Sequence, residues 1–362
     1  MDWIDLGLIA LRVLVVFGML QVVTILLVWF ERKIVADMQN RIGPDRAGPW
    51  GILQTLADGV KLLFKEQVTP RKVELGLYLA APVLAVVPAF LMFMVIPFGR
   101  PVRINLAGED RLIPLQGADL NVGLLYVLAM SSIAVYAVVL AGWSSGSKYP
   151  LLGGVRATAQ AISYEAAMGL SLVPVILFTG SVRLSEIVAY QSGSLTFLGR
   201  SFDFLPAWNL FILAPSFLIF FIAAVAETNR APFDLVEAEQ EIVGGFHTEY
   251  SGLRFALFFL AEYINIFTMS ALAVTLFLGG WSGPTWDDSL PLLVSAVLPT
   301  VWFLAKVTLF LFLYVWLRAT LPRLRYDQLM NLGWKRLIPA SLGWLFLIGG
   351  ALAVRQFGLP WG

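Results

Sequence analysis

The sequence predicts an all-α, polytopic membrane protein. Of its 362 residues, 59% are hydrophobic and only 14% are charged, which makes the chain far more apolar than an ordinary soluble domain. Apolar runs long enough to cross a bilayer core ~30 Å thick as helices recur along the whole chain. We therefore expect a single integral membrane domain over residues 1–362, with about eight transmembrane helices.

Eight stretches meet the requirement of roughly 20 apolar residues for a membrane-spanning helix. Several contain proline, which membrane helices tolerate where neighbouring groups satisfy the freed backbone. The first stretch has acidic residues before it and no small-residue cleavage site after it, so we expect a retained span rather than a signal peptide. The expected spans cover residues 8–30, 75–97, 120–142, 157–180, 204–226, 254–279, 290–317 and 337–354.

The basic residues are distributed unevenly between the connections of these spans. The first, third, fifth and seventh connections, with Arg254 at the start of the sixth span, hold 17 Lys and Arg residues, whereas the other connections and the C-terminal segment together hold 6. Because positive charge marks cytoplasmic connections, we expect both termini on the outer side of the membrane. The fifth connection, residues 227–253, is then an acidic loop on the cytoplasmic side.

The rare residue types exclude several kinds of site. The chain has no cysteine and a single histidine, His247, so it lacks the usual ligands of iron–sulfur clusters and haem. The net charge of +1 favours no particular partner, and no nucleic acid is expected. We expect no iron–sulfur cluster, flavin or haem in this chain, and we interpret His247 as a loop residue with satisfied hydrogen bonds.

An amphipathic helix is expected within the first cytoplasmic connection. In GILQTLADGVKLLFKE, residues 51–66, apolar residues recur at helical spacing, and Gln54, Asp58, Lys61 and Lys65 occupy the opposite face. The segment is too polar to span and should lie at the interface or beneath the bundle. An anchor at the membrane surface, in which Asp58 and Lys61 form a helix-surface ion pair, would show the same pattern.

Apart from Arg12 and Arg254 near span ends, three charged residues fall inside the expected spans, namely Glu165, Glu262 and Lys306. A charge near the centre of a membrane helix costs at least ~2.5 kcal/mol, so each should face the bundle interior or a wet cavity. Glu165 and Glu262 share one depth, ~12 Å from the cytoplasmic ends of their spans at the α-helical rise. Two interpretations remain: Lys306 neutralises a glutamate in a buried pair, or these groups belong to a proton relay.

The acidic loop begins with AETNRAPFDLVEAEQEIVGGFHTEY, residues 226–250, which contains six carboxylates and one arginine. Glu227 lies three residues before Arg230, a spacing that allows an ion pair on a helix. Most charge runs are solvated loops, but here apolar residues alternate with the acids and predict partial burial. The loop is therefore either a solvated acidic segment, a funnel of coupled carboxylates or a docking face for a basic partner.

Two segments carry a resemblance to a known family. GILQTLADGVKLLFKE at 51–66 and PFDLVEAEQEIVGG at 232–245 resemble the signature segments of one membrane subunit of the proton-pumping NADH:quinone oxidoreductase, or respiratory complex I. This subunit lies between the redox arm and the proton-pumping arm and is the bacterial counterpart of mitochondrial complex I subunit 1. The resemblance extends over nearly the whole chain. It includes ERKIVADMQNRIGP at 31–44, AGWSSGSKYPLLGGVRATAQAISYE at 141–165, GGFHTEYSG at 244–252 and RATLPRLRYDQLMNLGWK at 318–335.

The resemblance implies a subunit without redox centres, which is part of an enzyme but is not catalytic alone. Such subunits form the access path and the membrane-side wall of the quinone cavity, and they couple reduction of ubiquinone or menaquinone to proton translocation. The implied partners are hydrophilic quinone-site and iron–sulfur subunits on the cytoplasmic face, small membrane subunits and the lipid bilayer. The implied location is a bacterial inner membrane with periplasmic termini, and the second to sixth spans would resemble half of an antiporter-like subunit.

The matching motifs also imply two groups of site residues. The quinone path would be lined or supported by Glu31, Arg32, Gln54, Asp58, Lys61, Arg230, Phe233 and Arg318. The carboxylate-rich channel of the family would comprise Glu165, Glu227, Asp234, Glu237, Glu239, Glu241, Glu249 and Glu262, with Lys306 added from its position in the seventh span. The chain departs from some relatives in carrying Ser132 where they carry a glutamate, so the proton path there would use water or another group.

Three other functions fit parts of the sequence. The homologous membrane subunit of an energy-converting hydrogenase or formate hydrogenlyase would use no quinone. A stand-alone cation/proton antiporter would bind its coupling ion at the buried acidic and basic groups. A purely structural scaffold would have no need for Glu165 and Glu262 at one depth.

Overall fold

The computed structural model describes residues 3–106, 109–197, 200–235, 243–283 and 292–357. Seven helices in these ranges are long and apolar enough to cross a membrane. The described strands form two short antiparallel hairpins that the sequence did not predict, β1–β2 and β3–β4. The prediction of an all-α, polytopic membrane protein is confirmed.

The described helices follow one another along the chain in the order given next. They are α1 (Trp3–Met38), α2 (Gln54–Phe64), α3 (Leu75–Phe93), α4 (Gly123–Ser144), α5 (Lys148–Thr179), α6 (Leu184–Gln191), α7 (Asn209–Ile212), α8 (Ala214–Glu227), α10 (Gly252–Phe277), α11 (Leu292–Thr320), α12 (Tyr326–Leu332) and α13 (Ile338–Phe357). The strands are β1 (Val102–Leu106), β2 (Glu109–Ile113), β3 (Ser194–Phe197) and β4 (Arg200–Pro206). Single turns occupy Pro49–Gly51, Gly245–His247 and Gly333–Leu337.

The fifth expected span, residues 204–226, differs from the prediction. Its main helix α8 has 14 residues, a length of ~21 Å that falls short of the ~30 Å hydrocarbon core. The preceding residues pair in strand β4, and the short helix α7 follows before α8. Pro215 lies in the first turn of α8, where a missing N–H breaks no hydrogen bond, so the helix begins there.

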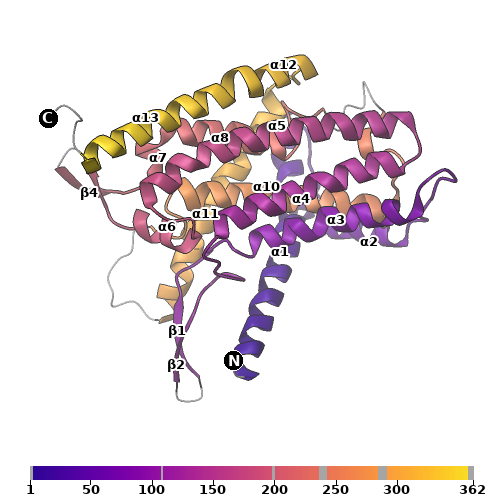
Figure 1. The fold of residues 1–362 in the computed structure, drawn as a ribbon. Helices are drawn as coiled ribbons and strands as arrows, with labels where there is room; N and C mark the ends of the chain where they lie inside the picture. The colour runs from indigo at the N-terminus through magenta and orange to yellow at the C-terminus, as the bar shows by residue number, and fades with distance from the viewer. Residues whose placement is uncertain (1–2, 107–108, 198–199, 236–242, 284–291, 358–362) are drawn as a thin grey trace.

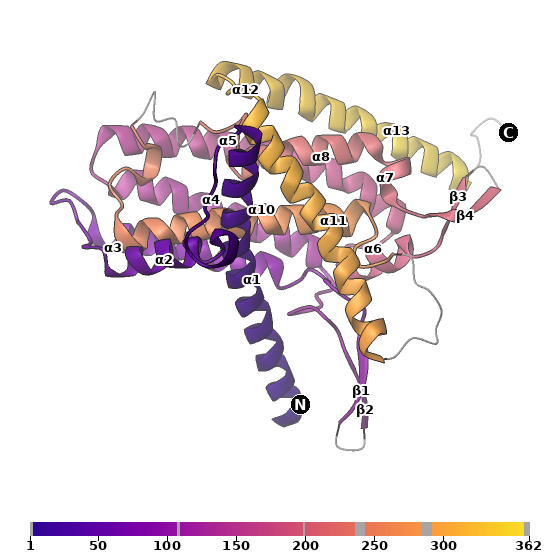
Figure 2. The same ribbon diagram turned by 180° about the vertical axis from the view of Figure 1, so that it is seen from behind.

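Five helices pack side by side into one bundle, namely α3, α4, α5, α8 and α10 (Figure 1). Helices α1 and α11 cross this bundle obliquely and meet near their C-terminal ends (Figure 2). Helix α13 lies along α5 and α8. These five bundle helices are the second to sixth predicted spans, and their likeness to an antiporter-like subunit stays a prediction.

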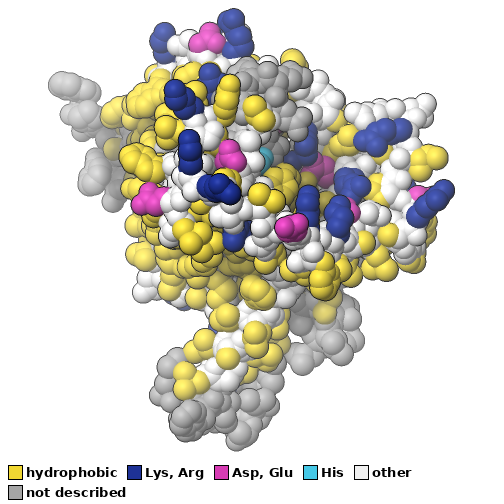
Figure 3. All heavy atoms as spheres, turned by 90° about the vertical axis from the view of Figure 1, so that its right-hand side faces the viewer, with side chains coloured by type: hydrophobic (Ala, Val, Ile, Leu, Met, Phe, Trp, Pro, Cys, Tyr) yellow, Lys and Arg dark blue, Asp and Glu magenta, His cyan; other side chains and the backbone are white. Residues whose placement is uncertain are grey.

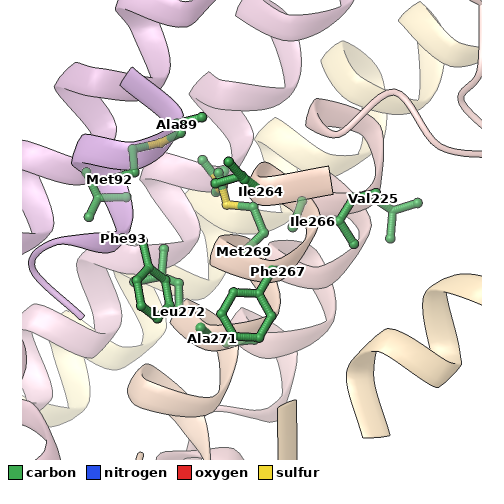
Figure 4. Close-up of a cluster of buried hydrophobic side chains, with 14 of the residues drawn as sticks. Ala89, Met92, Phe93, Val225, Ile264, Ile266, Phe267, Met269, Ala271 and Leu272 are labelled. Atoms are coloured by element: carbon green, nitrogen blue, oxygen red, sulfur yellow. The ribbon is translucent and has the colours of Figure 1, made fainter. Parts of the chain in front are cut away.

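Helix α10 lies at the centre of the bundle. In its most apolar stretch of 18 residues, 72% of the residues are buried. Its side chains pack against α3, and the rings of Phe93 and Phe267 lie 5.2 Å apart between centroids. Where α4 meets α5, a Cβ on Gly142 would lie 2.6 Å from the Pro150 carbonyl oxygen, so only glycine allows this approach. Figure 4 shows part of the core, with Ala89, Met92, Phe93, Val225, Ile264, Ile266, Phe267, Met269, Ala271 and Leu272 labelled.

Lys and Arg side chains gather on the side of the molecule where α3, α5 and α10 begin (Figure 3). Lys65, Arg71 and Lys72 are exposed in the connection between α2 and α3, and Lys148 is exposed at the start of α5. The sequence predicts that these connections are cytoplasmic, because basic residues are retained on the cytoplasmic side of membranes. The orientation itself stays a prediction.

Candidate functional site

The turn after α8 places Arg230 inside the bundle. Gln160 on α5 is fully buried, and its Nε2 donates to the carbonyl oxygens of Ala226 at 2.7 Å and Phe233 at 2.9 Å. The same nitrogen lies 3.3 Å from Asn229 Oδ1. Because one side chain bonds both ends of the turn, Gln160 sets its shape and the direction of Arg230.

A second set of contacts fixes the far end of this turn. Phe233 is 5% exposed, and its ring packs on Tyr164 with 5.3 Å between centroids. The amide of Leu324 donates to the Pro232 carbonyl at 3.0 Å. Arg323 Nη2 lies 3.1 Å from Asp234 Oδ2. The connection after α11 therefore covers the predicted PFD motif.

Arg230 pairs with two glutamates from different helices. Its Nε lies 2.9 Å from Glu262 Oε1 on α10, and its Nη1 lies 3.3 Å from Glu31 Oε1 on α1. The guanidinium also lies over the ring of Tyr263, 4.6 Å from its centroid. The two carboxylates hold the pKa of Arg230 above its usual range despite burial, which alone would lower it. The predicted i,i+3 pair of Arg230 with Glu227 is wrong, because both ion partners of Arg230 come from other helices.

Arg318 on α11, whose side chain is 41% exposed, completes this cluster. Its Nη1 donates to Glu31 Oε1, so one carboxylate joins the two arginines. A small cavity of about 10 Å³ lies beside the cluster and is lined by apolar residues together with Glu31, Arg230 and Arg318. Two carboxylates and two guanidinium groups thus meet between α1, α10 and α11, where their formal charges balance.

The remaining residues of the predicted quinone group form a separate, more exposed cluster. Arg32 Nη1 lies 2.8 Å from Asp58 Oδ2 on α2, and Lys61 Nζ lies 3.6 Å from Asp58 Oδ1. Gln54 Nε2 donates to Asp58 Oδ1 at 3.2 Å. Glu31 and Arg32 are neighbours on α1 but point to different places, since Glu31 is 7% exposed and the Arg32 side chain is 47% exposed. Helix α1 therefore joins the two clusters.

Two serines of α4 contact the carboxylates of two other helices. Ser131 Oγ donates to Glu227 Oε1 at the end of α8, and Ser132 Oγ contacts Glu165 Oε1 on α5. Ser132 is the position where some relatives were expected to carry a glutamate. Here a hydroxyl group occupies that place and bonds directly to the neighbouring carboxylate.

Two cavities lie beside Glu227. One of about 80 Å³ is lined by Glu227 and Glu262 together with Asn229, His247 and Asn265. The other, of about 70 Å³, is lined by Glu227, Asn229, Asn265 and Ser131. These groups form a polar line through the bundle. It runs from Glu165 through the α4 serines to Glu227, then across these cavities to Glu262, and on through Arg230 and Glu31 to Arg318.

His247 lies at the edge of the larger cavity, among aromatic rings. Its ring meets those of Phe246 and Phe255 with centroids 5.0 and 5.3 Å away. This burial lowers the pKa of His247 to about 4, although Asp234 acts in the opposite direction. Histidine is therefore neutral here at pH 7, and the described residues contain no group of acids and histidines suited to a metal ion.

The second half of the acidic loop is held by a pair of tyrosines. The rings of Tyr78 and Tyr250 stack with 4.2 Å between centroids. Tyr78 Oη donates to the Glu249 carbonyl at 2.8 Å, and Tyr250 Oη donates to the Tyr78 carbonyl at 3.1 Å. Burial raises the pKa of Tyr250 to about 12, so it stays a donor at neutral pH. Glu249 thus contributes a backbone contact to the loop anchor.

Lys306 does not pair with a glutamate among the described residues, so that interpretation is wrong. Its Nζ donates to the carbonyl oxygens of Leu278, Gly280 and Ser282, at 2.7, 3.0 and 2.5 Å. These carbonyls follow the C-terminal end of α10, where a cation is favoured by the helix dipole. The ammonium group also lies 4.9 Å from the centroid of the Trp208 ring. Lys306 therefore caps α10 at the end opposite to the glutamates.

Some predicted residues lie outside the described part of the chain, and others were missed. Glu237, Glu239 and Glu241 fall within residues 236–242, outside the described residues. Sequence reasoning missed Gln160, Ser131, Tyr263 and Asn265. A polar residue inside an apolar span was a usable signal for Gln160, and helical spacing from Glu262 was one for Asn265. No pattern indicated Tyr263.

The comparison with protein families agrees with this architecture. Residues 11–349 match the family model described as NADH dehydrogenase. The match includes every member of the polar line from Glu165 to Arg318. The chain is therefore a membrane protein that belongs to the NADH dehydrogenase family, the family of mitochondrial complex I subunit 1 and its bacterial counterparts.

Proposed function

We propose that this chain is the membrane subunit that couples quinone reduction to proton translocation in a proton-pumping NADH:quinone oxidoreductase. In this proposal the chain forms the access path and the membrane-side wall of the quinone cavity. It lies in a bacterial inner membrane with periplasmic termini. Its partners are the hydrophilic quinone-site and iron–sulfur subunits and the small membrane subunits.

One observation carries the proposal, namely that Arg230 pairs with both Glu31 and Glu262. Glu31 belongs to the residues expected at the quinone side, whereas Glu262 belongs to those expected in the proton channel. Removing one partner of a buried pair leaves an uncompensated charge that costs about 3–5 kcal/mol. A change of charge at the quinone side would therefore alter the electrostatic interaction between Arg230 and Glu262.

The exposed cluster of Arg32, Asp58, Lys61 and Gln54 supports a quinone path on the side of α1 and α2. Gln54, Asp58 and Lys61 lie on α2 opposite an apolar face, in which Leu63 is 57% and Phe64 86% exposed, and Arg32 reaches them from α1. A quinone combines a polar headgroup with an apolar tail, and such a surface offers contacts to both. Phe233 and Arg318 would support the path from the interior.

The polar line from Glu165 to Glu262 supports the proton-coupling role. In the proposal Glu227, Asp234, Glu237, Glu239, Glu241 and Glu249 also take part, as members of the acidic loop and its ends. Buried carboxylates within hydrogen-bonding reach of hydroxyl groups and cavities are the usual components of proton paths in membranes. The α4 serines would take the place of the glutamate that some relatives carry.

The test uses Glu227→Gln in the assembled complex, reconstituted into liposomes. Glutamine keeps the shape and accepts the Ser131 hydrogen bond but carries no titratable proton. We expect proton translocation to fall by about tenfold, equivalent to about 1.4 kcal/mol in the barrier. The measurement is quinone reduction by NADH and proton uptake in the same vesicles. Normal values of both would contradict the proposal.

Glu186→Gln is the matched control, because Glu186 is an exposed carboxylate in α6, away from the polar line. It should leave both activities unchanged.

The alternatives predict other results with the native complex. A hydrogenase or formate hydrogenlyase subunit would copurify with partners that reduce no quinone. An independent antiporter would exchange cations for protons as a single chain in liposomes.

A further inference from the structure

The two cavities beside Glu227 share much of their lining. Ala134, Val138, Glu227, Asn229 and Asn265 line both of them. Most other lining residues are apolar, so the polar atoms are few and their partners can be followed one by one. Only the larger cavity reaches Glu262, and only the smaller one reaches Ser131.

Two buried acceptor atoms in this shared lining have no hydrogen-bond partner among the described residues. Glu227 Oε1 accepts from Ser131, but Glu227 Oε2 is unpaired. Asn265 Oδ1 is likewise buried and unpaired. Native proteins pair nearly all such atoms with protein groups or ordered water, because an unpaired buried acceptor is costly.

Water fits these two atoms better than a protein donor does. Neither an amide oxygen nor an ionised carboxylate supplies a hydrogen, so the two acceptors cannot satisfy each other while Glu227 is ionised. A water molecule has two hydrogens and can donate one to each oxygen. When Glu227 is protonated, the same water can accept from it and still donate to Asn265. Buried waters need two to four polar partners and a cavity of at least about 10–15 Å³, and these cavities of about 80 and 70 Å³ provide both.

Asn265 lies on the same face of α10 as Glu262. The two residues are three positions apart, which brings their side chains next to each other on a helix. Both line the larger cavity with Glu227. A water bound at Asn265 therefore lies on the Glu262 side of Glu227, in the cavity that these three residues line together.

We propose that the cavity between α8 and α10 binds an ordered water molecule that donates to Glu227 Oε2 and Asn265 Oδ1. Asn265 is a positioning residue that keeps this water between Glu227 and Glu262. For proton transfer, the Glu227 carboxylic acid gives its proton to the water, which releases another of its protons towards the Glu262 carboxylate. The water is regenerated, and one proton has moved from Glu227 to Glu262. Water binding stands by itself, whereas the transfer step rests on the proposed function.

The first test is a high-resolution structure of the assembled native complex. We expect a density peak within hydrogen-bonding distance of both Glu227 Oε2 and Asn265 Oδ1. A direct contact between the two side chains, or a cavity filled by side chains of another subunit, would overturn the proposal. This measurement requires no variant and does not depend on activity.

The second test compares Asn265→Leu with Asn265→Asp in the complex. Leucine has a similar size but binds no water, whereas aspartate retains acceptor oxygens. We expect Asn265→Leu to lose the density peak and to reduce proton translocation in liposomes by roughly tenfold, while Asn265→Asp retains the water. Ser270→Ala is the matched control on α10, because Ser270 is buried and bonds the Ile266 carbonyl of its own helix. It should change neither property.

The failures of the two proposals can be distinguished. If Glu227→Gln lowers proton translocation but Asn265→Leu leaves it normal, the water relay is wrong and the coupling function stands. If the water is present and neither variant affects translocation, the site exists but the transfer step falls together with the proposed function. If Asn265→Leu does not assemble, the native density and the Asn265→Asp variant still decide the outcome.

Discussion

Arg230 Nε lies 2.9 Å from Glu262 Oε1, so the arginine of the acidic loop pairs with a glutamate of the most buried helix. The same guanidinium reaches Glu31 on α1. This contact joins the two groups of residues that the sequence assigns to different roles. Three helices, α1, α10 and α11, supply the remaining charges around it.

The arginines of this cluster should differ in importance according to burial. The side chain of Arg230 is 7% exposed, so we expect Arg230→Gln to lose about 3–5 kcal/mol of stability. Arg318 is 41% exposed, where solvent screens its pair, and Arg318→Gln should lose about 1 kcal/mol or less. The thermal unfolding midpoint of the solubilised complex measures the order. Arg325→Gln, at a 74% exposed side chain, is the control, and equal effects of all three would refute the ranking.

Gln160 should matter for quinone kinetics as well as for stability. Gln160→Leu leaves the carbonyls of Ala226 and Phe233 without their donor, which costs about 1–3 kcal/mol. Because the turn that carries Arg230 then shifts, we expect a several-fold higher KM for quinone. Gln191→Leu is the matched control, since Gln191 is equally buried but bonds residues at the far end of α10. If both variants change the KM alike, Gln160 has only a general structural role.

Lys306 should contribute to stability and not to proton movement. Lys306→Met removes hydrogen bonds from a charged donor to three carbonyls, a loss of at least about 2 kcal/mol. We expect a lower unfolding midpoint and an unchanged number of protons translocated per NADH. A lower proton number in a variant of normal stability would instead assign Lys306 to the proton path.

Ser131 should be required as a donor to Glu227. Ser131→Ala removes the only protein hydrogen bond described for the Glu227 carboxylate. The carboxylate then has no fixed donor that orients it and favours one of its protonation states. We expect several-fold slower proton translocation in liposomes. Ser131→Thr keeps the hydroxyl group and should restore the rate, and an alanine variant with full activity would show that the bond is dispensable.

The burial of His247 should make the complex less stable in acid. The pKa of His247 is lowered to about 4 from its usual value near 6.5. Its contribution is fully present above pH 6.5 and is lost as the pH falls towards 4, by up to about 1.4 kcal/mol per pH unit. His247→Phe fits among the neighbouring rings and carries no titratable group. Unfolding midpoints between pH 7 and 5 should fall less steeply in this variant than in the native complex, and parallel curves would refute the role of His247.

The sequence predicts the helices because hydrophobic length is a local property of the chain. A span of roughly 20 apolar residues has one low-energy conformation in a bilayer, which is a helix. Helices α3, α10 and α11 were therefore found close to their observed ends. The fifth span was placed too early because β4 forms by pairing with β3, and pairing between strands is not encoded in apolar length alone.

Candidate site residues were also partly visible in the sequence. A buried charge is costly in a membrane, so the sequence identified Glu165, Glu262 and Lys306 as candidate site residues. Their partners did not stand out. The expected pair of Glu227 with Arg230 relied on neighbours along one helix, whereas the chain turns after α8 and sends Arg230 into the interior.

By itself, the sequence determined the class of protein, the family resemblance and which charged residues lie inside membrane spans. Composition, motif and hydrophobic length are properties that can be read along the chain. The tertiary structure alone decided which charges meet. Arg230 finds Glu31 and Glu262, Lys306 finds the carbonyls at the end of α10, and Glu227 finds Ser131. Ion pairs and hydrogen bonds act over a few ångströms in space, and only the packing of distant helices brings these atoms within that range.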